Sequence, residues 1–123
     1  MPSILIIDDD ASLRAGLRRA LQKAGYTVVE ACNGLQGLQS LTTTPIDLVL
    51  LDVFMPDKDG LETIKELRAA KPEMRVIVMS GGGTKGAVDV LQIARYLGAS
   101  RTLVKPFSRG RLLEAVWEEL MLV

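Results

Sequence analysis

Short apolar runs alternate with amphipathic stretches along the whole chain. Each apolar run is bounded by turn residues, which is typical of a strand buried on both faces of a sheet. The stretches between the runs carry apolar residues at helical spacing, for example Leu13, Leu17 and Leu21. The pattern predicts strands at 4–7, 26–31, 47–51, 75–79 and 102–104, alternating with helices at 11–24, 35–41, 61–71 and 84–97 and with a last helix that follows Ser108.

Local signals refine these boundaries. Gly25 is expected to end the first helix, and Gly37 to weaken the second. The segment 42–45, Thr-Thr-Thr-Pro, is interpreted as a loop, and Ser108 as the cap of the last helix. That helix is expected to bury a stripe of apolar residues in the core or at an interface: Leu113, Val116, Trp117 and Leu120.

Strands that alternate with helices indicate an α/β fold. Parallel neighbours need a helical crossover between them, so the chain is expected to form a doubly wound parallel sheet with helices on both faces. A length of 123 residues suits one domain. The sequence shows no repeat or linker, and residues 1–123 are interpreted as a single domain without an output domain.

Composition excludes several classes of function. Fifteen basic and fifteen acidic residues balance, which gives no overall electrostatic signature for direct nucleic-acid or anionic-membrane binding. Histidine is absent, which removes imidazole catalysis and imidazole metal ligands. Cys32 is the single cysteine, so no disulfide framework exists. The first apolar run is too short for a signal peptide or a membrane span, and a cytoplasmic protein is expected.

Polar residues with metal and phosphate chemistry stand at the carboxyl ends of the expected strands. They are Asp8, Asp9, Asp52, Ser80 and Lys105. If the strand order is 2-1-3-4-5, these side chains meet at one edge of the sheet, where ligands of such folds bind. One ammonium offsets only one of three carboxylates. A divalent cation with oxygen ligands neutralises the rest, and the pattern therefore predicts a Mg²⁺ site that is open to a phosphoryl group.

The same residues resemble the receiver domains of two-component response regulators. The resemblance rests on the run Ile4–Asp9, on Asp52 followed by Met55-Pro56 and Asp59-Gly60, on Ser80-Gly81, and on Lys105-Pro106-Phe107. It covers essentially the whole chain. It implies a flavodoxin-like (βα)5 sandwich with strand order 2-1-3-4-5. It also implies a phosphoacceptor switch rather than an enzyme, with at most slow autodephosphorylation.

The resemblance also implies a role for each matching residue. Asp52 would accept a phosphoryl group from a sensor histidine kinase or a histidine phosphotransfer protein. Asp9, Asp52 and the backbone carbonyl of Phe54 would ligate Mg²⁺, for which Mn²⁺ could substitute, and Asp8 would hold a metal-bound water. Lys105, the Ser80 hydroxyl and the Gly81 N–H would contact the phosphoryl oxygens. The Lys105-Pro106 peptide bond is expected to be cis.

Phosphorylation would bias the surface formed by the expected fourth helix, the fifth strand and the last helix. A downstream effector, an output domain or a second copy of the chain would bind there. Two departures from the family pattern bear on this switch. Thr102 occupies the position where the family commonly has an aromatic residue, so switching is expected to be absent there or rerouted. Phe54 and Gly82 flank the expected path of an attacking water without a hydrogen-bonding side chain, which predicts a long-lived phosphoryl group.

Two other functions fit part of the pattern. A Mg²⁺-dependent phosphohydrolase of the haloacid-dehalogenase type would use Asp8 and Asp10 in the run IIDDDAS, but it leaves the segment 52–56 unexplained. A receiver-like adaptor without phosphoryl turnover would not need the complete set of acidic, hydroxyl and lysine positions. Taken singly, each residue also has an ordinary structural role, such as Asp10 capping a helix.

Overall fold

A computed structural model describes residues 1–53, 60–81, 92, 95 and 98–121. The elements in this part of the chain are β1 (Ser3–Ile7), α1 (Ala11–Lys23), β2 (Thr27–Ala31), α2 (Gly34–Thr43), β3 (Leu48–Asp52), α3 (Gly60–Ala70), β4 (Arg75–Gly81), β5 (Arg101–Lys105) and α5 (Arg109–Met121). The helix expected at 84–97 lies outside the described residues, apart from Gln92 and Arg95, which are helical. The numbering of the helices therefore passes from α3 to α5.

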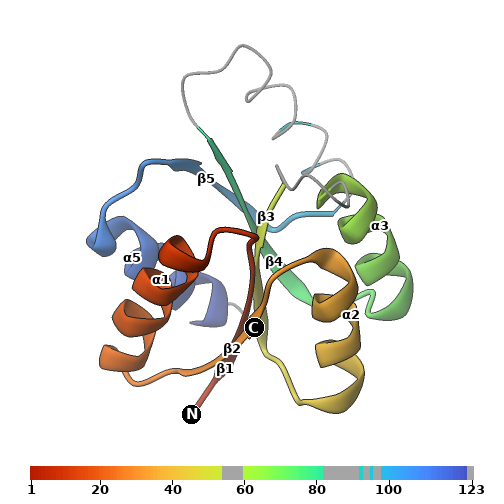
Figure 1. Cartoon of the computed structure of the whole chain (residues 1–123), viewed down its shortest axis with the longest axis horizontal. Coiled ribbons are helices and arrows are strands. Elements are labelled where there is room, and N and C mark those ends of the chain that lie inside the picture. Colours follow the sequence, from red (N-terminus) through yellow and green to blue (C-terminus); the bar gives the residue numbers. More distant parts are fainter. Residues whose placement is uncertain (54–59, 82–91, 93–94, 96–97, 122–123) are drawn as a thin grey trace.

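The five strands form one parallel sheet in the order β2-β1-β3-β4-β5, which confirms the expected flavodoxin-like topology. Helices α1 and α5 cover one face of this sheet, and α2 and α3 cover the other (Figure 1). β1 and β3 are neighbours although α1, β2 and α2 lie between them in sequence. The chain therefore changes direction across the sheet between these two strands, and a ligand site is expected at their carboxyl ends.

Two hydrophobic cores lie on opposite faces of the sheet. Successive strand residues point to opposite faces, so Leu5 and Ile7 belong to the core under α2 and α3, while Ile4 and Ile6 belong to the core under α1 and α5. All four residues of Leu48–Leu51 are fully buried. Each such aliphatic side chain contributes about 1.5–3 kcal/mol by burial. Continuous apolar runs therefore form the central strands.

Helix ends follow the sequence signals closely. The Asp10 carboxylate accepts from Leu13 N at 3.1 Å and caps α1, and the Ser108 hydroxyl accepts from Arg111 N at 3.0 Å at the start of α5. α1 ends before Gly25, whose φ of 100° is the left-handed conformation that glycine favours. These caps confirm the expected boundaries of the first and last helices.

Gly37 has a packing role that its helix propensity does not reveal. A Cβ atom there would lie 2.3 Å from Ile7 Cδ1, so glycine lets α2 approach β1 closely. The same helix continues through Thr42 and Thr43, where a loop was expected. The Thr42 hydroxyl donates to Gln39 O at 2.7 Å, and such bonds to preceding carbonyls let threonines stay in the last turn.

α5 buries most of the stripe expected for it, because Val116 lies in the core and Leu113 and Leu120 pack against it. Leu112 and Val116 are buried, whereas the Trp117 side chain is 58% exposed, so Trp117 does not belong to the core. Glu119 is buried instead. Its carboxylate accepts from Arg101 Nε at 3.2 Å. Burial alone lowers the pKa of Arg101, but hydrogen bonds and attraction to Glu119 and Glu118 raise it overall.

Arg68 connects several segments at the end of the sheet where the strands begin. Its guanidinium donates to Pro72 O at 2.8 Å, to Met74 O at 2.6 Å and to Gly98 O at 2.5 Å. Burial lowers the pKa of this guanidinium. Arg68 thereby joins the end of α3, the connection to β4 and the segment before β5.

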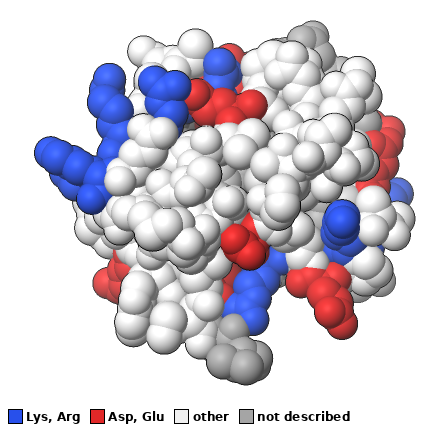
Figure 2. Space-filling model, turned by 90° about the horizontal axis from the view of Figure 1, so that it is seen from below, with Lys and Arg blue, Asp and Glu red and all other residues white. Residues whose placement is uncertain are grey.

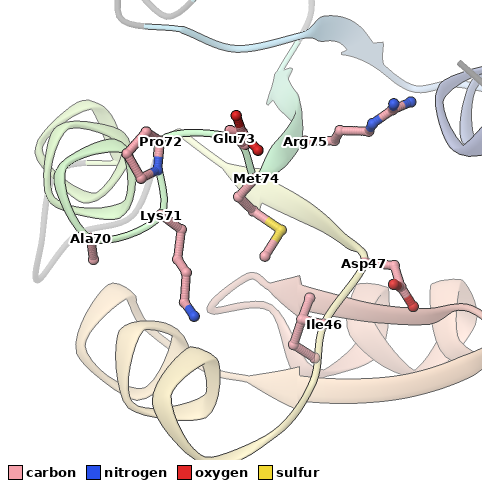
Figure 3. A pocket seen from close by; sticks show the side chains of 8 residues that line it. All are labelled: Ile46, Asp47, Ala70, Lys71, Pro72, Glu73, Met74 and Arg75. Atoms are coloured by element: carbon pink, nitrogen blue, oxygen red, sulfur yellow. The ribbon is translucent and has the colours of Figure 1, made fainter. Parts of the chain in front are cut away.

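A surface cavity of about 540 Å³ lies at the same end of the sheet. Figure 3 shows the eight residues that line it. Ile46 and Met74 pack against the core, while the Arg75 side chain turns away and donates to the Glu119 carbonyl. The charged groups of this cavity do not converge, and the polar residues singled out in the sequence lie at the other edge.

Candidate functional site

Asp8 follows β1 and is completely buried. Its backbone N–H donates to Ala31 O at 3.1 Å, which continues the β1–β2 ladder, and its Oδ1 accepts from Asp10 N at 3.0 Å. Arg14, one turn into α1, donates to the Asp8 carbonyl at 2.7 Å. These contacts leave Asp8 Oδ2 to face Lys105, so the turn between β1 and α1 fixes the orientation of this carboxylate.

Asp52 is the last residue of β3 and is 4% exposed. The chain leaves the strand through Val53, whose N–H donates to Met79 O at 3.1 Å. α3 returns close to this point: a Cβ atom at Gly60 would lie 2.3 Å from Val53 Cα and 2.8 Å from Asp52 O. Glycine at Gly60 therefore allows the start of α3 to approach the backbone at the end of β3.

Lys105 ends β5 and joins the two buried carboxylates. Its Nζ lies 3.2 Å from Asp8 Oδ2 and 3.4 Å from Asp52 Oδ2. The peptide bond that follows, between Lys105 and Pro106, is cis, as the resemblance implied. One ammonium group thus forms salt bridges with two aspartates, which stand at the ends of two different strands.

Asp8, Asp9 and Asp52 form a cluster of carboxylates. One oxygen from each lies within 4.8 Å of the others, and Asp9 is the exposed member. Three carboxylates and one ammonium leave a formal excess of two negative charges. Two unit charges about 4 Å apart repel by about 4 kcal/mol at an effective dielectric constant near 20. A hard divalent cation with oxygen ligands fits this donor set, and the exposed Asp9 gives it a path from solvent.

Ser80 and Gly81 end β4 beside the cluster. The sheet register pairs Asp52 with Met79 and Lys105 with Gly81, so Ser80 lies one residue beyond the level of Asp52. Ser80 is fully buried, and its hydroxyl has no hydrogen-bond partner among the described residues. A buried hydroxyl without a partner costs about 1–3 kcal/mol, which a ligand oxygen at this edge of the sheet would recover.

Three residues named from the sequence are not part of this cluster as described. Phe54, the expected source of a backbone ligand, lies outside the described residues. Thr102 lies within β5, opposite Val78 and partly exposed. Asp10 is exposed, and its Oδ1 caps α1. The phosphohydrolase hypothesis requires Asp10 as a second catalytic carboxylate. The structure instead gives Asp10 the role of a helix cap.

Comparison with known proteins identifies the family. Residues 4–117 match the family model described as "Response regulator receiver domain". The chain belongs to this family. It is 38% identical over 119 residues to sporulation initiation phosphotransferase F of Bacillus subtilis, which covers 97% of the chain and 94% of that protein. It is also 38% identical over 115 residues to chemotaxis protein CheY of the same organism, with 92% of each covered.

Solved structures agree with the family assignment. The crystal structure of a CheY-like response regulator receiver domain protein from Methanospirillum hungatei superimposes with a TM-score of 0.89 at 28% identity, covering 98% of the chain and 94% of that protein. The receiver domain therefore acts as a phosphoacceptor in two-component signalling, and nothing in these comparisons supports the phosphohydrolase hypothesis. None of the helices within the described residues combines the length and the apolar character that a bilayer span needs.

Proposed function

We propose that Asp52 accepts the phosphoryl group, from a phosphohistidine on a sensor kinase or a phosphotransfer protein. The convergence of three carboxylates and one ammonium at one sheet edge carries this proposal. In the transfer, an Asp52 oxygen forms a bond to phosphorus while the P–N bond to the donor imidazole breaks, and the released imidazole takes up a proton. Asp52 is preferred over Asp8 because its place at the end of β3, before Met55-Pro56, is the one that the resemblance to receiver domains assigns to the phosphoacceptor, and because Asp8 is completely buried.

Mg²⁺ is the metal that we propose for the acidic cluster, with Mn²⁺ as a substitute. Asp9, Asp52 and the Phe54 carbonyl would hold it directly, and Asp8 through a water molecule. When bound, the dication neutralises charge on the carboxylates and on the phosphoryl oxygens. Mg²⁺ accommodates such sites because it retains several waters and typically takes only one or two carboxylates from the protein.

Lys105, Ser80 and Gly81 would receive the phosphoryl group. Lys105 would exchange its contact with Asp52 for one with a phosphoryl oxygen and keep Asp8 as its second partner. The Ser80 hydroxyl would donate to another oxygen, which gives this buried group the partner it lacks among the described residues. The Gly81 N–H would complete the set. Positioning and charge neutralisation are the main requirements of phosphoryl transfer.

The switching surface would lie over β5 and α5, together with the segment 84–97. Val104 on β5 and Trp117 and Met121 on α5 are large apolar residues that expose 50%, 58% and 58% of their area. An effector, an output domain or a second copy of the chain could cover them in the cytoplasm. Because Thr102 is too small to act as an aromatic switch, the signal would pass through Ser80 and β4 instead.

A long phosphoryl lifetime is proposed from Phe54 and Gly82, both of which lie outside the described residues. Neither side chain can orient an attacking water. The Phe54→Asn variant should therefore lose its phosphoryl group faster than the wild-type domain. Radiolabelled or mass-resolved decay measures this, and slower or equal decay in the variant would contradict the proposal.

The central test is intact-mass spectrometry after treatment with acetyl phosphate and Mg²⁺. The wild-type domain should gain the mass of one phosphoryl group, and Asp52→Asn should gain none. Omission of Mg²⁺ should prevent the gain. Hydroxylamine, which cleaves acyl phosphates, followed by peptide mapping should place the modification on Asp52; a label on Asp8 would refute the assignment.

A further inference from the structure

Two adjoining cavities lie at the end of the sheet where the strands begin. One, of about 540 Å³, is lined mainly by residues 70–75, from the end of α3 to the start of β4. The other, of about 400 Å³, is lined mainly by residues 41–46, between the last turns of α2 and β3. Both are lined by Ile46, Lys71 and Met74, and both have volumes within the range of about 300–1,000 Å³ that is usual for small-ligand sites. They share no residue with the proposed phosphoacceptor site, which lies at the opposite edge of the sheet.

The three shared residues point into the same space. Figure 3 shows the Ile46 and Met74 side chains entering it from opposite sides. Both pack against the core as partly buried residues, so the atoms that they leave exposed form an apolar floor. Lys71 extends its aliphatic stem across this space and carries its ammonium toward α2 (Figure 3). A lysine in this position covers apolar surface with its stem and keeps its charge at the rim.

The Lys71 ammonium forms no ion pair within the part of the chain that the structure describes. The two carboxylates of the lining are directed elsewhere. Glu73 projects away from the cavity, and the Asp47 carboxylate accepts from Ser3 N at 2.7 Å. The Arg75 side chain also turns away (Figure 3). Figure 2 views the molecule from this end and shows charged side chains set apart by uncharged surface. A single cation thus faces the apolar floor.

Hydrogen bonds fix both walls of the site. Arg68 donates to the carbonyls of Pro72 and Met74 at 2.8 and 2.6 Å, and Met74 N donates to Lys71 O at 3.1 Å. On the opposite wall, Asp47 N donates to the first carbonyl of β1 at 2.8 Å. Because these bonds already order the segments that carry the lining residues, little conformational entropy is lost when a ligand binds.

The geometry points to a binding site for a small carboxylic acid with an aliphatic chain. The carboxylate pairs with the Lys71 ammonium, and the chain lies over Ile46 and Met74. One lysine is a point charge, whereas phosphate groups are better matched by the planar forks of arginines. The apolar floor is also small, which suits a compact ligand rather than the larger interface core of a stable protein complex. The site is independent of phosphoryl transfer to Asp52 and gives the domain a second ligand.

The test is a two-dimensional NMR titration of ¹⁵N-labelled protein with sodium octanoate as the probe. We expect shifts of the amides at 41–47 and 70–75, with a dissociation constant below about 1 mM. Hexanoate should bind more weakly, by up to about fourfold for each methylene that is no longer buried. 1-Octanol, which has the same chain length without the charge, should bind about tenfold more weakly than octanoate. The Asp52→Asn variant should bind octanoate as well as the wild-type domain does.

Matched variants test the two halves of the site. Lys71→Met removes the ammonium and keeps an apolar stem, so it should weaken octanoate binding about tenfold and remove the preference over 1-octanol. Lys65→Met, which removes an exposed cation of α3 outside the lining, should change neither. Ala70→Glu places a carboxylate in the lining and should block binding. Ala69→Glu, at the neighbouring exposed position outside the lining, should not, and it matches the effect of a glutamate on the last turn of α3.

Several results would overturn the proposal. These are the absence of shifts at about 10 mM octanoate, equal affinities of Lys71→Met and the wild-type domain, and equal affinities of Ala70→Glu and Ala69→Glu. Equal binding of hexanoate and octanoate would also refute it, because the chain would then make no contact with the floor. So would binding to vesicles that contain oleate without any shift by free octanoate, which would assign this surface to a membrane. Because Asp52→Asn is titrated in parallel, failure of the phosphoacceptor proposal would leave this result interpretable.

Discussion

Replacing Lys105 by Met removes the ammonium group beside the acidic cluster. The resulting loss in the free energy of unfolding should show how much this charge stabilises the domain. The Nζ–oxygen distances of 3.2 Å to Asp8 and 3.4 Å to Asp52 correspond to about 5 kcal/mol of attraction each at an effective dielectric constant of 20. These gross values overstate the net effect, because burying the three groups costs solvation and the lysine side chain is 22% exposed. Removing one partner of a fully buried pair costs about 3–5 kcal/mol, so we expect a loss of about 2–3 kcal/mol here.

The assay is urea unfolding at neutral pH with EDTA, repeated in excess Mg²⁺. Without metal, Lys105→Met should unfold at a lower urea concentration than the wild-type domain. The slope of the unfolding free energy against urea concentration should not change. With Mg²⁺ the difference should shrink, because the dication replaces the missing positive charge and meets no competing ammonium. Mg²⁺ should also bind the variant more tightly than the wild type.

Lys65→Met is the matched control, since Lys65 is exposed on α3 and should change stability by no more than about 0.5 kcal/mol. Equal stability of Lys105→Met and wild type in EDTA would refute the reasoning. So would a difference that Mg²⁺ leaves unchanged, because the loss would then come from packing of the lysine stem rather than from charge.

Three further predictions concern single positions. Asp10→Ala should cost about 1 kcal/mol through the lost cap of α1, measured by thermal unfolding, yet leave acetyl phosphate labelling intact; loss of labelling would restore a catalytic role for Asp10. Gly60→Ala should destabilise the domain and slow its labelling, because the new Cβ would collide with the backbone of Val53 and displace Asp52; wild-type behaviour would show that the approach relaxes freely. Thr102→Tyr should alter how partner affinity depends on phosphorylation, and unchanged affinities by calorimetry would show that this position does not switch.

Much of the fold follows from the sequence because each central strand is apolar on both faces. Runs such as Leu48–Leu51 cannot be solvated on either side, so helices must cover both faces of the sheet, and parallel strands then bring Asp8, Asp52 and Lys105 to one edge. The convergence of these side chains was therefore predictable, and the structure confirms it.

Other features depend on contacts that periodicity does not encode. The buried face of α5 extends to Glu119 because its carboxylate accepts a hydrogen bond from the Arg101 guanidinium on β5, a partner that periodicity does not reveal. The hydrogen bond from Arg14 to the Asp8 carbonyl depends on how the chain turns between β1 and α1. The length of α2 reflects hydroxyl bonds within its last turn, which compete with the loop signal of Thr42 and Thr43.

The hydrogen bonds of Arg68 limit which substitutions the domain can accept at the end of the sheet where the strands begin. Arg68 uses two nitrogens, Nη1 for the carbonyls of Pro72 and Met74 and Nη2 for that of Gly98, whereas a lysine has only one, so exchanging arginine for lysine there is not conservative. A methyl group added at Gly98 would also collide with Arg68 Nε, at 2.7 Å. The Gly98 backbone, with a φ of 111°, also strains any side chain, so a substitution at Arg68 would relieve this collision without making Gly98 replaceable.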